Sequence, residues 1–128
     1  MKVKVKQNFY YPDVMVVCNP NDKINDYYKT QPSVIVEVLS RSTRRFDKTH
    51  KRQAYQTLES LQEYVLVDQD RAEIEVFTRH SGWQAEYFYP GDTIRFQSIE
   101  VAVAVEDIYY QVDNDDMLAF WQAKQTQA

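Results

Sequence analysis

The stretch "SVIVEVLS", Ser33 to Ser40, contains five Val, Ile or Leu residues in eight positions. A run this apolar predicts a strand that other elements cover on both faces of a sheet. Glu37 lies inside the run, where an ionised carboxylate is costly to desolvate unless a cation or a metal ion accompanies it. The stretch therefore predicts both the centre of the fold and a candidate functional residue.

Strand patterns precede and follow this stretch, at residues 2–5, 12–18, 63–68, 73–80, 83–90 and 92–98. The first of them, "KVKV", alternates like an edge strand, and "RHSGWQ" is a hairpin signal between two later strands. A helix is predicted from about Thr43 to Glu59, because residues from Lys51 onward follow the spacing of one helix face. This order of elements predicts an α+β domain around one mixed sheet.

The C-terminal segment is harder to interpret, because "EVAVAVEDIYYQV" suits a further strand or a helix that begins near Val105. We interpret "DIYYQV", residues 107–112, as a short helix and expect a frayed helix from about Asp115. The predicted domain therefore spans residues 1–112, and residues 113–128 form a C-terminal helical tail.

The composition of the 128-residue chain suits a single domain, because 44% hydrophobic residues can bury a core without crosslinks. The one cysteine, Cys18, has no partner for a disulfide, which excludes a zinc-cysteine site and suits a reducing compartment. No run approaches the roughly 18 apolar residues of a membrane span. These features predict a soluble cytoplasmic protein with no membrane partner.

A second acid, Asp13, lies at the start of the apolar run "VMVVC". If that strand neighbours the one that carries Glu37, the two carboxylates converge at one edge of the sheet. Mg²⁺, or Mn²⁺, suits such a pair, and a bound ion lowers the pKa of its water and neutralises charge on a phosphodiester. Lys51, projecting from the apolar side of the helix, could stabilise charge at the same place. The pattern predicts a metal-dependent phosphodiesterase site.

Three segments together resemble one known family: "YYPDVMVVC", "VIVEVLSRSTRRFDKTHKRQAYQTLESLQEYVLVD" and "YFYPGDTIRF". They are similar to the Uma-two family of endonucleases, within the PD-(D/E)xK restriction-endonuclease-like superfamily, over about Val3 to Val112. The resemblance implies a restriction-endonuclease-like mixed sheet with a flanking helix and Mg²⁺-dependent hydrolysis of DNA. Family members begin with a helix, a hairpin and a second helix before the PD segment, and we expect this chain to lack those elements.

The family pattern implies roles for four residues of this chain. Asp13 and Glu37 match the metal-binding and catalytic acids, and the D-x-x-x-K pair of the following helix falls on Asp47 and Lys51. In the wider superfamily the lysine follows the glutamate by two residues, but that position is Leu39 here. The resemblance thus implies that Lys51 is the catalytic lysine and Asp47 a supporting residue.

Each of these residues also has a simpler interpretation. Glu37 could pair with Arg41 or another nearby cation, and Asp13 could cap the entrance of its strand. Lys51 could extend to water and pair with Asp47, four residues earlier on the helix. Ser40 could contact a phosphate or cap the strand end.

The segment "RSTRRFDKTHKR", residues 41–52, has six Lys or Arg residues among twelve, in a chain whose net charge is -4. Beside the acids this basic run suits contacts with a DNA backbone, although an ordinary solvated helix face explains it too. The residues predicted to contact the backbone are Arg41, Arg44, Arg45 and Lys48.

Two other functions fit the sequence besides a nuclease. The chain could be an inactive family member that dimerises or binds a partner over an exposed sheet face. It could also be a β-rich domain that binds a small ligand through the strands after Glu63. That last hypothesis predicts a pocket among those strands.

Overall fold

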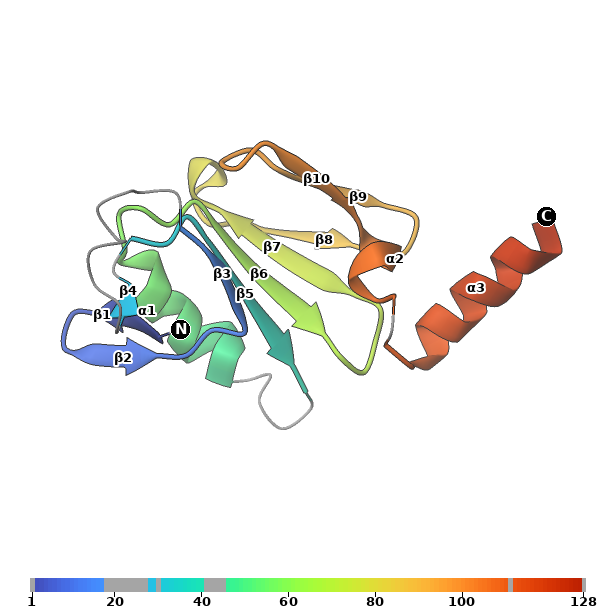
Figure 1. Cartoon of the computed structure of the whole chain (residues 1–128), viewed down its shortest axis with the longest axis horizontal. Helices are drawn as coiled ribbons and strands as arrows, with labels where there is room; N and C mark the ends of the chain where they lie inside the picture. The colour runs from blue at the N-terminus through green and yellow to red at the C-terminus, as the bar shows by residue number, and fades with distance from the viewer. Residues whose placement is uncertain (1, 18–27, 30, 41–45, 111, 128) are drawn as a thin grey trace.

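The computed structural model describes residues 2–17, 28–29, 31–40, 46–110 and 112–127, with the backbone alone at 9, 28, 46–48 and 127. Its centre is a five-stranded sheet in the order β3-β5-β6-β7-β8 (Figure 1). β5 and β6 are parallel, and the other neighbouring strands are antiparallel, so the predicted mixed sheet is confirmed. The strands are β3 (Val14–Val16), β5 (Val34–Leu39), β6 (Glu63–Asp68), β7 (Ile74–Thr78) and β8 (Ala85–Phe88).

The remaining strands form two smaller sheets beside the predicted mixed sheet. β1 (Lys2–Val5) lies between β2 (Asn8–Tyr10) and β4 (Tyr28–Lys29). β1 is therefore the central strand of its sheet and not the predicted edge strand. β9 (Thr93–Phe96) and β10 (Val101–Ala104) form a separate antiparallel hairpin.

The helix after β5 is shorter than predicted. It begins as a π-helix, η2 (Phe46–Lys51), and continues as α1 (Arg52–Gln56), while residues 43–45 lie outside the described part. Its end comes three residues before the predicted one, because the hydroxyl and the N–H of Thr57 both donate to the carbonyl of Ala54, at 2.7 and 3.2 Å. That tight turn closes the helix and leads into β6.

The hairpin signal "RHSGWQ" is confirmed by η3 (Arg79–Ser81), a short 3-10 turn between β7 and β8. Gly82, which follows it, has a φ of 75°, a left-handed conformation that glycine adopts at little cost. β10 leads directly into α2 (Val105–Ile108), two residues earlier than the predicted short helix. The predicted start of the last helix is confirmed by α3 (Asp115–Gln127).

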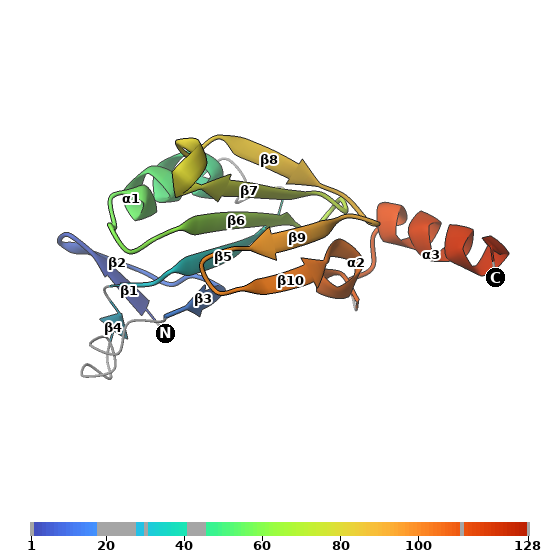
Figure 2. The same ribbon diagram turned by 90° about the horizontal axis from the view of Figure 1, so that it is seen from above.

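Both faces of the five-stranded sheet are covered, which explains the uninterrupted apolar run of β5. The helix α1 packs on one face, and β9, β10 and α2 pack on the other (Figure 2). Because side chains alternate along a strand, Ile35, Glu37 and Leu39 share the face that α1 covers. The buried core on that face comprises Val3, Val5, Ile35, Leu39, Tyr55, Leu61, Tyr64, Leu66 and Phe77.

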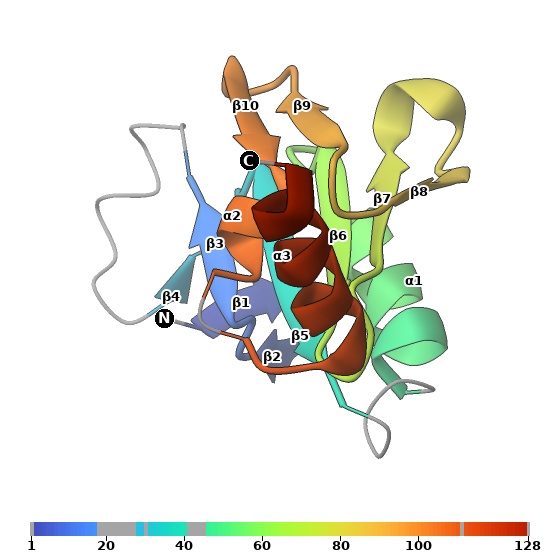
Figure 3. The same ribbon diagram turned by 90° about the vertical axis from the view of Figure 1, so that its right-hand side faces the viewer.

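The C-terminal segment is held to the opposite face at its beginning. Tyr109 is buried, and its hydroxyl lies 2.6 Å from the carbonyl oxygen of Asp68 and 3.0 Å from that of Glu73. Burial raises the pKa of the Tyr109 phenol well above its usual value. Met117, in the first turn of α3, is also buried, and Phe120 and Trp121 pack against the same core. The later turns of α3 extend away from the sheets (Figure 1), and α3 lies in front of them in the view of Figure 3. Among the described helices, none is long and apolar enough to cross a membrane.

Candidate active site

Glu37 is buried at the middle of β5, with 2% of its surface exposed. Its carboxylate faces the helical segment, where the hydroxyl of Tyr55 donates a hydrogen bond to Oε1 at 3.3 Å. Nζ of Lys51 lies 3.9 Å from Oε2. A buried carboxylate needs such partners, because the surroundings of a core solvate charge poorly. The structure therefore answers why an acid interrupts the apolar run: it pairs with a cation and a hydroxyl from the next helix.

The helical segment delivers both partners from one face, because Lys51 and Tyr55 are four residues apart. Tyr55 is fully buried, and its ring lies 5.3 Å from that of Tyr10 and 5.6 Å from that of Tyr64, measured between centroids. The side chain of Lys51 is 21% exposed, so its stem packs against the core while the ammonium group stays near solvent. The pair thus sits at the margin of the core, with the ammonium group on the solvent side.

Asp13 lies at the start of β3, the edge strand beside β5. The register pairs Val14 with Val36, so the next position places Asp13 beside Glu37. Oδ2 of Asp13 accepts a hydrogen bond of 2.7 Å from the backbone N–H of Val38. The side chain is exposed and extends the hydrogen bonding of the two strands beyond the last backbone pair. The structure thus brings the two predicted acids to adjacent strands at one edge of the sheet, and Asp13 also performs the strand-capping role of the simpler interpretation.

The donor chemistry of this edge fits a hard divalent cation. Mg²⁺ is commonly held by one or two carboxylates, with water completing its octahedral shell. Asp13 and Glu37 supply two carboxylates, and Oδ2 of Asp13 is the oxygen engaged by the backbone. Within the described residues, no group of three or more His, Cys, Asp or Glu side chains is placed to hold a metal. An ion at this edge would therefore rely on two acids and water.

The structure describes only some of the other predicted site residues. Ser40 directly follows β5 and is half-buried. Asp47 and Lys48 belong to η2, where the structure describes their backbone alone. Arg41, Arg44 and Arg45 lie outside the described residues, so the proposed contacts of the basic run with DNA stay predictions.

Sequence reasoning missed two residues on this face. Tyr55 follows Lys51 at the spacing of one helix face, but sequence reasoning overlooked that its hydroxyl would reach the same carboxylate as Lys51. It also overlooked Glu75, which the strand registers align with Glu37 across Leu66 and which is only 7% exposed. The signal for Glu75 was the same as for Glu37, an acid inside an apolar strand.

Removing the hydroxyl of Tyr55 tests its hydrogen bond with Glu37. We expect Tyr55→Phe to lower the free energy of unfolding by about 1–2 kcal/mol, because a buried carboxylate oxygen loses its donor while the ring packing is kept. Urea unfolding measures the difference. Tyr110→Phe is the matched control, because Tyr110 is 72% exposed and its substitution should change stability by less than about 0.5 kcal/mol. Equal effects of the two substitutions would contradict the importance of this bond.

Comparison with known sequences identifies related proteins. A family model described as "Uma2: Putative restriction endonuclease" matches residues 1–106. An uncharacterized protein of Synechocystis sp. (strain PCC 6803) is 34% identical over 105 residues, which cover 80% of this chain and 55% of that protein. A second uncharacterized protein of the same organism is 46% identical over 66 residues, which cover 49% of this chain and 37% of that protein. The chain thus spans about half or less of the length of these relatives.

A solved structure shares the fold. It is described as "a putative nuclease belonging to DUF820" from Anabaena variabilis ATCC 29413, and it matches with a TM-score of 0.62 at 17% sequence identity. The match covers 88% of this chain and 66% of the other. The restriction-endonuclease-like α+β fold expected from the sequence agrees with this likeness.

Proposed function

Because the chain belongs to the Uma2 family, whose model matches residues 1–106, we propose that it contributes the active site of a divalent-cation-dependent endonuclease that hydrolyses DNA. The observation that carries the proposal is the Lys51 ammonium group 3.9 Å from the buried carboxylate of Glu37. The lysine of the wider superfamily lies two residues after the glutamate, at a position that is Leu39 in this chain. A lysine from the helix reaches the same carboxylate and supports the transfer of that role to Lys51.

The proposed reaction is attack of water on a backbone phosphorus. The new bond joins the water oxygen to phosphorus, one phosphorus–oxygen bond of the backbone breaks, and a proton ends on the leaving oxygen. Asp13 and Glu37 would hold the cation, which when bound supplies a water of lowered pKa and neutralises phosphate charge. Lys51 would orient the attacking water or stabilise the additional negative charge of the transition state. Tyr55, through its hydrogen bond, keeps the Glu37 carboxylate in one orientation.

The basic run supports DNA as the substrate. Lys and Arg side chains of this run would contact backbone phosphates, which positions a duplex without reading its sequence. Arg52, the last of these residues, already has a structural contact, since its guanidinium lies 4.6 Å from the centre of the Phe77 ring. We therefore assign the backbone contacts to Arg41, Arg44, Arg45 and Lys48, as the sequence predicts.

Binding of a divalent cation is tested by thermal unfolding with and without millimolar Mg²⁺ or Mn²⁺. A cation at about ten times its dissociation constant should stabilise the folded protein by about 1.4 kcal/mol. That gain corresponds to a rise in Tm of about 4 °C or more. Glu37→Gln should lose most of this rise, because the amide keeps the shape of the side chain but removes one of two anionic ligands.

The control for this experiment is Glu59→Gln, which removes the charge of an exposed glutamate outside the site. It should keep the full rise in Tm, whereas loss of the rise in both variants would indicate nonspecific binding to an acidic protein. If wild type and Glu37→Gln unfold cooperatively and neither responds to the cations, the metal-dependent proposal fails.

A second candidate function, self-association or partner binding without catalysis, has its own observation. Val14 and Val38 point to the same face of β3 and β5 and are 52% and 41% exposed, and the neighbouring Tyr11 is 69% exposed. Exposed apolar side chains at a sheet edge are a common feature of protein interfaces. This function becomes the better account if the protein binds no divalent cation and forms dimers in light scattering.

A further inference from the structure

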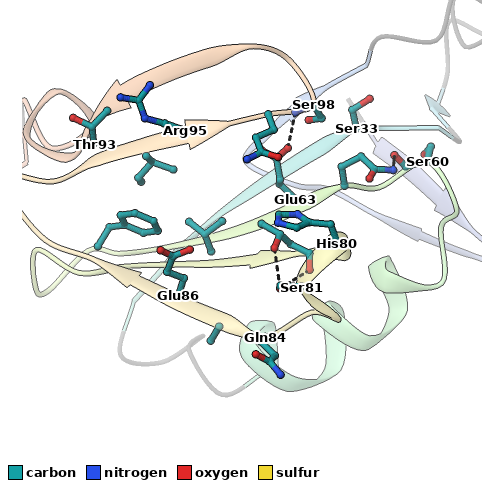
Figure 4. Close-up of a pocket in the computed structure, with 17 residues that line it drawn as sticks. Ser33, Ser60, Glu63, His80, Ser81, Gln84, Glu86, Thr93, Arg95 and Ser98 are labelled. Atoms are coloured by element: carbon teal, nitrogen blue, oxygen red, sulfur yellow. Dashed lines mark hydrogen bonds between the residues drawn. The ribbon is translucent and has the colours of Figure 1, made fainter.

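A cleft of about 960 Å³ lies on the face of the five-stranded sheet opposite Glu37. Residues of β6, β7, β8 and β9 line it, together with the turn after β9 (Figure 4). It includes Val76 and Ile94, which belong to the core beneath β9 and β10, whereas Glu37 faces α1. The cleft is therefore a site separate from the candidate active site. A pocket among the strands after Glu63 is also what the hypothesis of a ligand-binding domain predicts.

Glu63 is the unusual residue of this cleft. It is only 4% exposed, and its Oε1 accepts a hydrogen bond of 3.0 Å from the backbone N–H of Ser98 (Figure 4). Its Oε2 is buried and has no hydrogen-bond partner among the described residues. A buried carboxylate oxygen without a donor is unfavourable, and native structures usually provide one. Glu63 thus lines the cleft while one of its carboxylate oxygens stays buried and unused.

The other charged side chains of the cleft balance each other, so Glu63 determines the sign of its net charge. Glu86 on β8 and Arg95 on β9 are both exposed and opposite in charge (Figure 4). The buried carboxylate therefore makes the cleft favourable for a positively charged group.

The geometry of the carboxylate selects among positively charged groups. A guanidinium binds best through two parallel bonds to both oxygens of a carboxylate, but Oε1 of Glu63 is already engaged by Ser98. An ammonium group is a compact charge that can bind a single oxygen. On the same face as Glu63, the cleft offers the apolar side chains of Val76 and Ile94, whereas Phe88 lines its far end.

We propose that this cleft binds a small primary amine, with its ammonium group on Glu63 and its apolar body against Val76 and Ile94. Contact with the buried Oε2 requires a side chain of the wall to rotate. His80 lines the same wall and is exposed, so its rotation costs little. The inference does not depend on the proposed nuclease activity, because the two sites lie on opposite faces of the sheet.

The test is an NMR titration of the full chain with cyclohexylamine, and with cyclohexanol as the uncharged probe of the same shape. Cyclohexylamine should shift the amide signal of Ser98 in a saturable way and bind at least about tenfold more tightly than cyclohexanol. Glu63→Gln should weaken binding of the amine by about tenfold, since it keeps an acceptor for Ser98 but removes the charge. Glu59→Gln, outside the cleft, should leave the affinity within about twofold.

Three results would overturn the proposal: equal affinities for the amine and the alcohol, equal losses in Glu63→Gln and Glu59→Gln, or shifts that leave the Ser98 amide unchanged. If Glu63→Gln does not fold, the comparison of the two probes on the wild-type protein decides. Retention of amine binding in Glu37→Gln distinguishes this cleft from the candidate active site.

Discussion

Glu37→Gln is expected to lower the rate of DNA cleavage by about a hundredfold or more in the presence of Mg²⁺ or Mn²⁺. Glutamine keeps the size of the side chain and an oxygen that can accept the hydrogen bond from Tyr55. It removes the negative charge that would help to hold the cation and that faces Lys51 at 3.9 Å. The substitution therefore tests charge at the site with little change in packing. Nicking of supercoiled plasmid DNA provides a sensitive measurement.

Two controls make that result interpretable. Glu59→Gln should cleave DNA within about twofold of wild type, because Glu59 is exposed and outside the site. Circular dichroism and urea unfolding of Glu37→Gln should show a cooperatively folded protein. A folded Glu37→Gln protein that cleaves DNA as fast as wild type would contradict the assigned role of this carboxylate.

Lys51→Met is expected to lower cleavage by about a hundredfold while keeping the rise in Tm caused by the divalent cation. Methionine replaces the aliphatic stem of the lysine, and the two carboxylates that would hold the cation remain. A purely structural role for Lys51 predicts instead that cleavage falls only in proportion to the folded fraction. Plasmid nicking and thermal unfolding of the same samples separate the two roles.

The same substitution should also lower stability, because it removes the ammonium group of Lys51 from beside the buried carboxylate of Glu37. Loss of a partner from a fully buried ion pair destabilises by about 3–5 kcal/mol, and the partial exposure of Lys51 reduces this to about 1–3 kcal/mol. Lys124→Met is the matched control, because Nζ of Lys124 lies 3.8 Å from Glu106 but its side chain is 56% exposed. Its effect should be below about 1 kcal/mol, and an equal loss in both variants would argue against a buried pair at Glu37.

Local patterns predicted many elements of the fold correctly. The strand β6 matches its predicted bounds, and β5 differs by one residue at each end, because continuous apolar runs between polar turns have clear limits. The hairpin between β7 and β8 followed from a turn with Gly82. The place of β1 could not be predicted, because alternation along a strand shows which side chains are buried but not how many neighbours the strand has.

The candidate site, too, was predictable from the sequence only in part. The cost of a charge in an apolar strand identified Glu37, and helix spacing placed Lys51 on an inward face. That Lys51 and Tyr55 both reach Glu37 depends on how the helical segment packs across β5, which is a contact between residues distant in the sequence. The unused oxygen of Glu63 likewise depends on where the turn at Ser98 lies against β6.

By itself, the sequence determined the strands of the central sheet and which of their side chains face inward, because these follow from the spacing of apolar residues along the chain. It did not predict the short strands β2 and β4. The tertiary structure alone decided the strand order, the registers, the pairing of Lys51 with Glu37 and the place of Asp13 beside the strand of Glu37. The reason is physical: strand pairing and helix docking are non-local, and a shift of one residue in register would turn Glu37 to the other face of its neighbours.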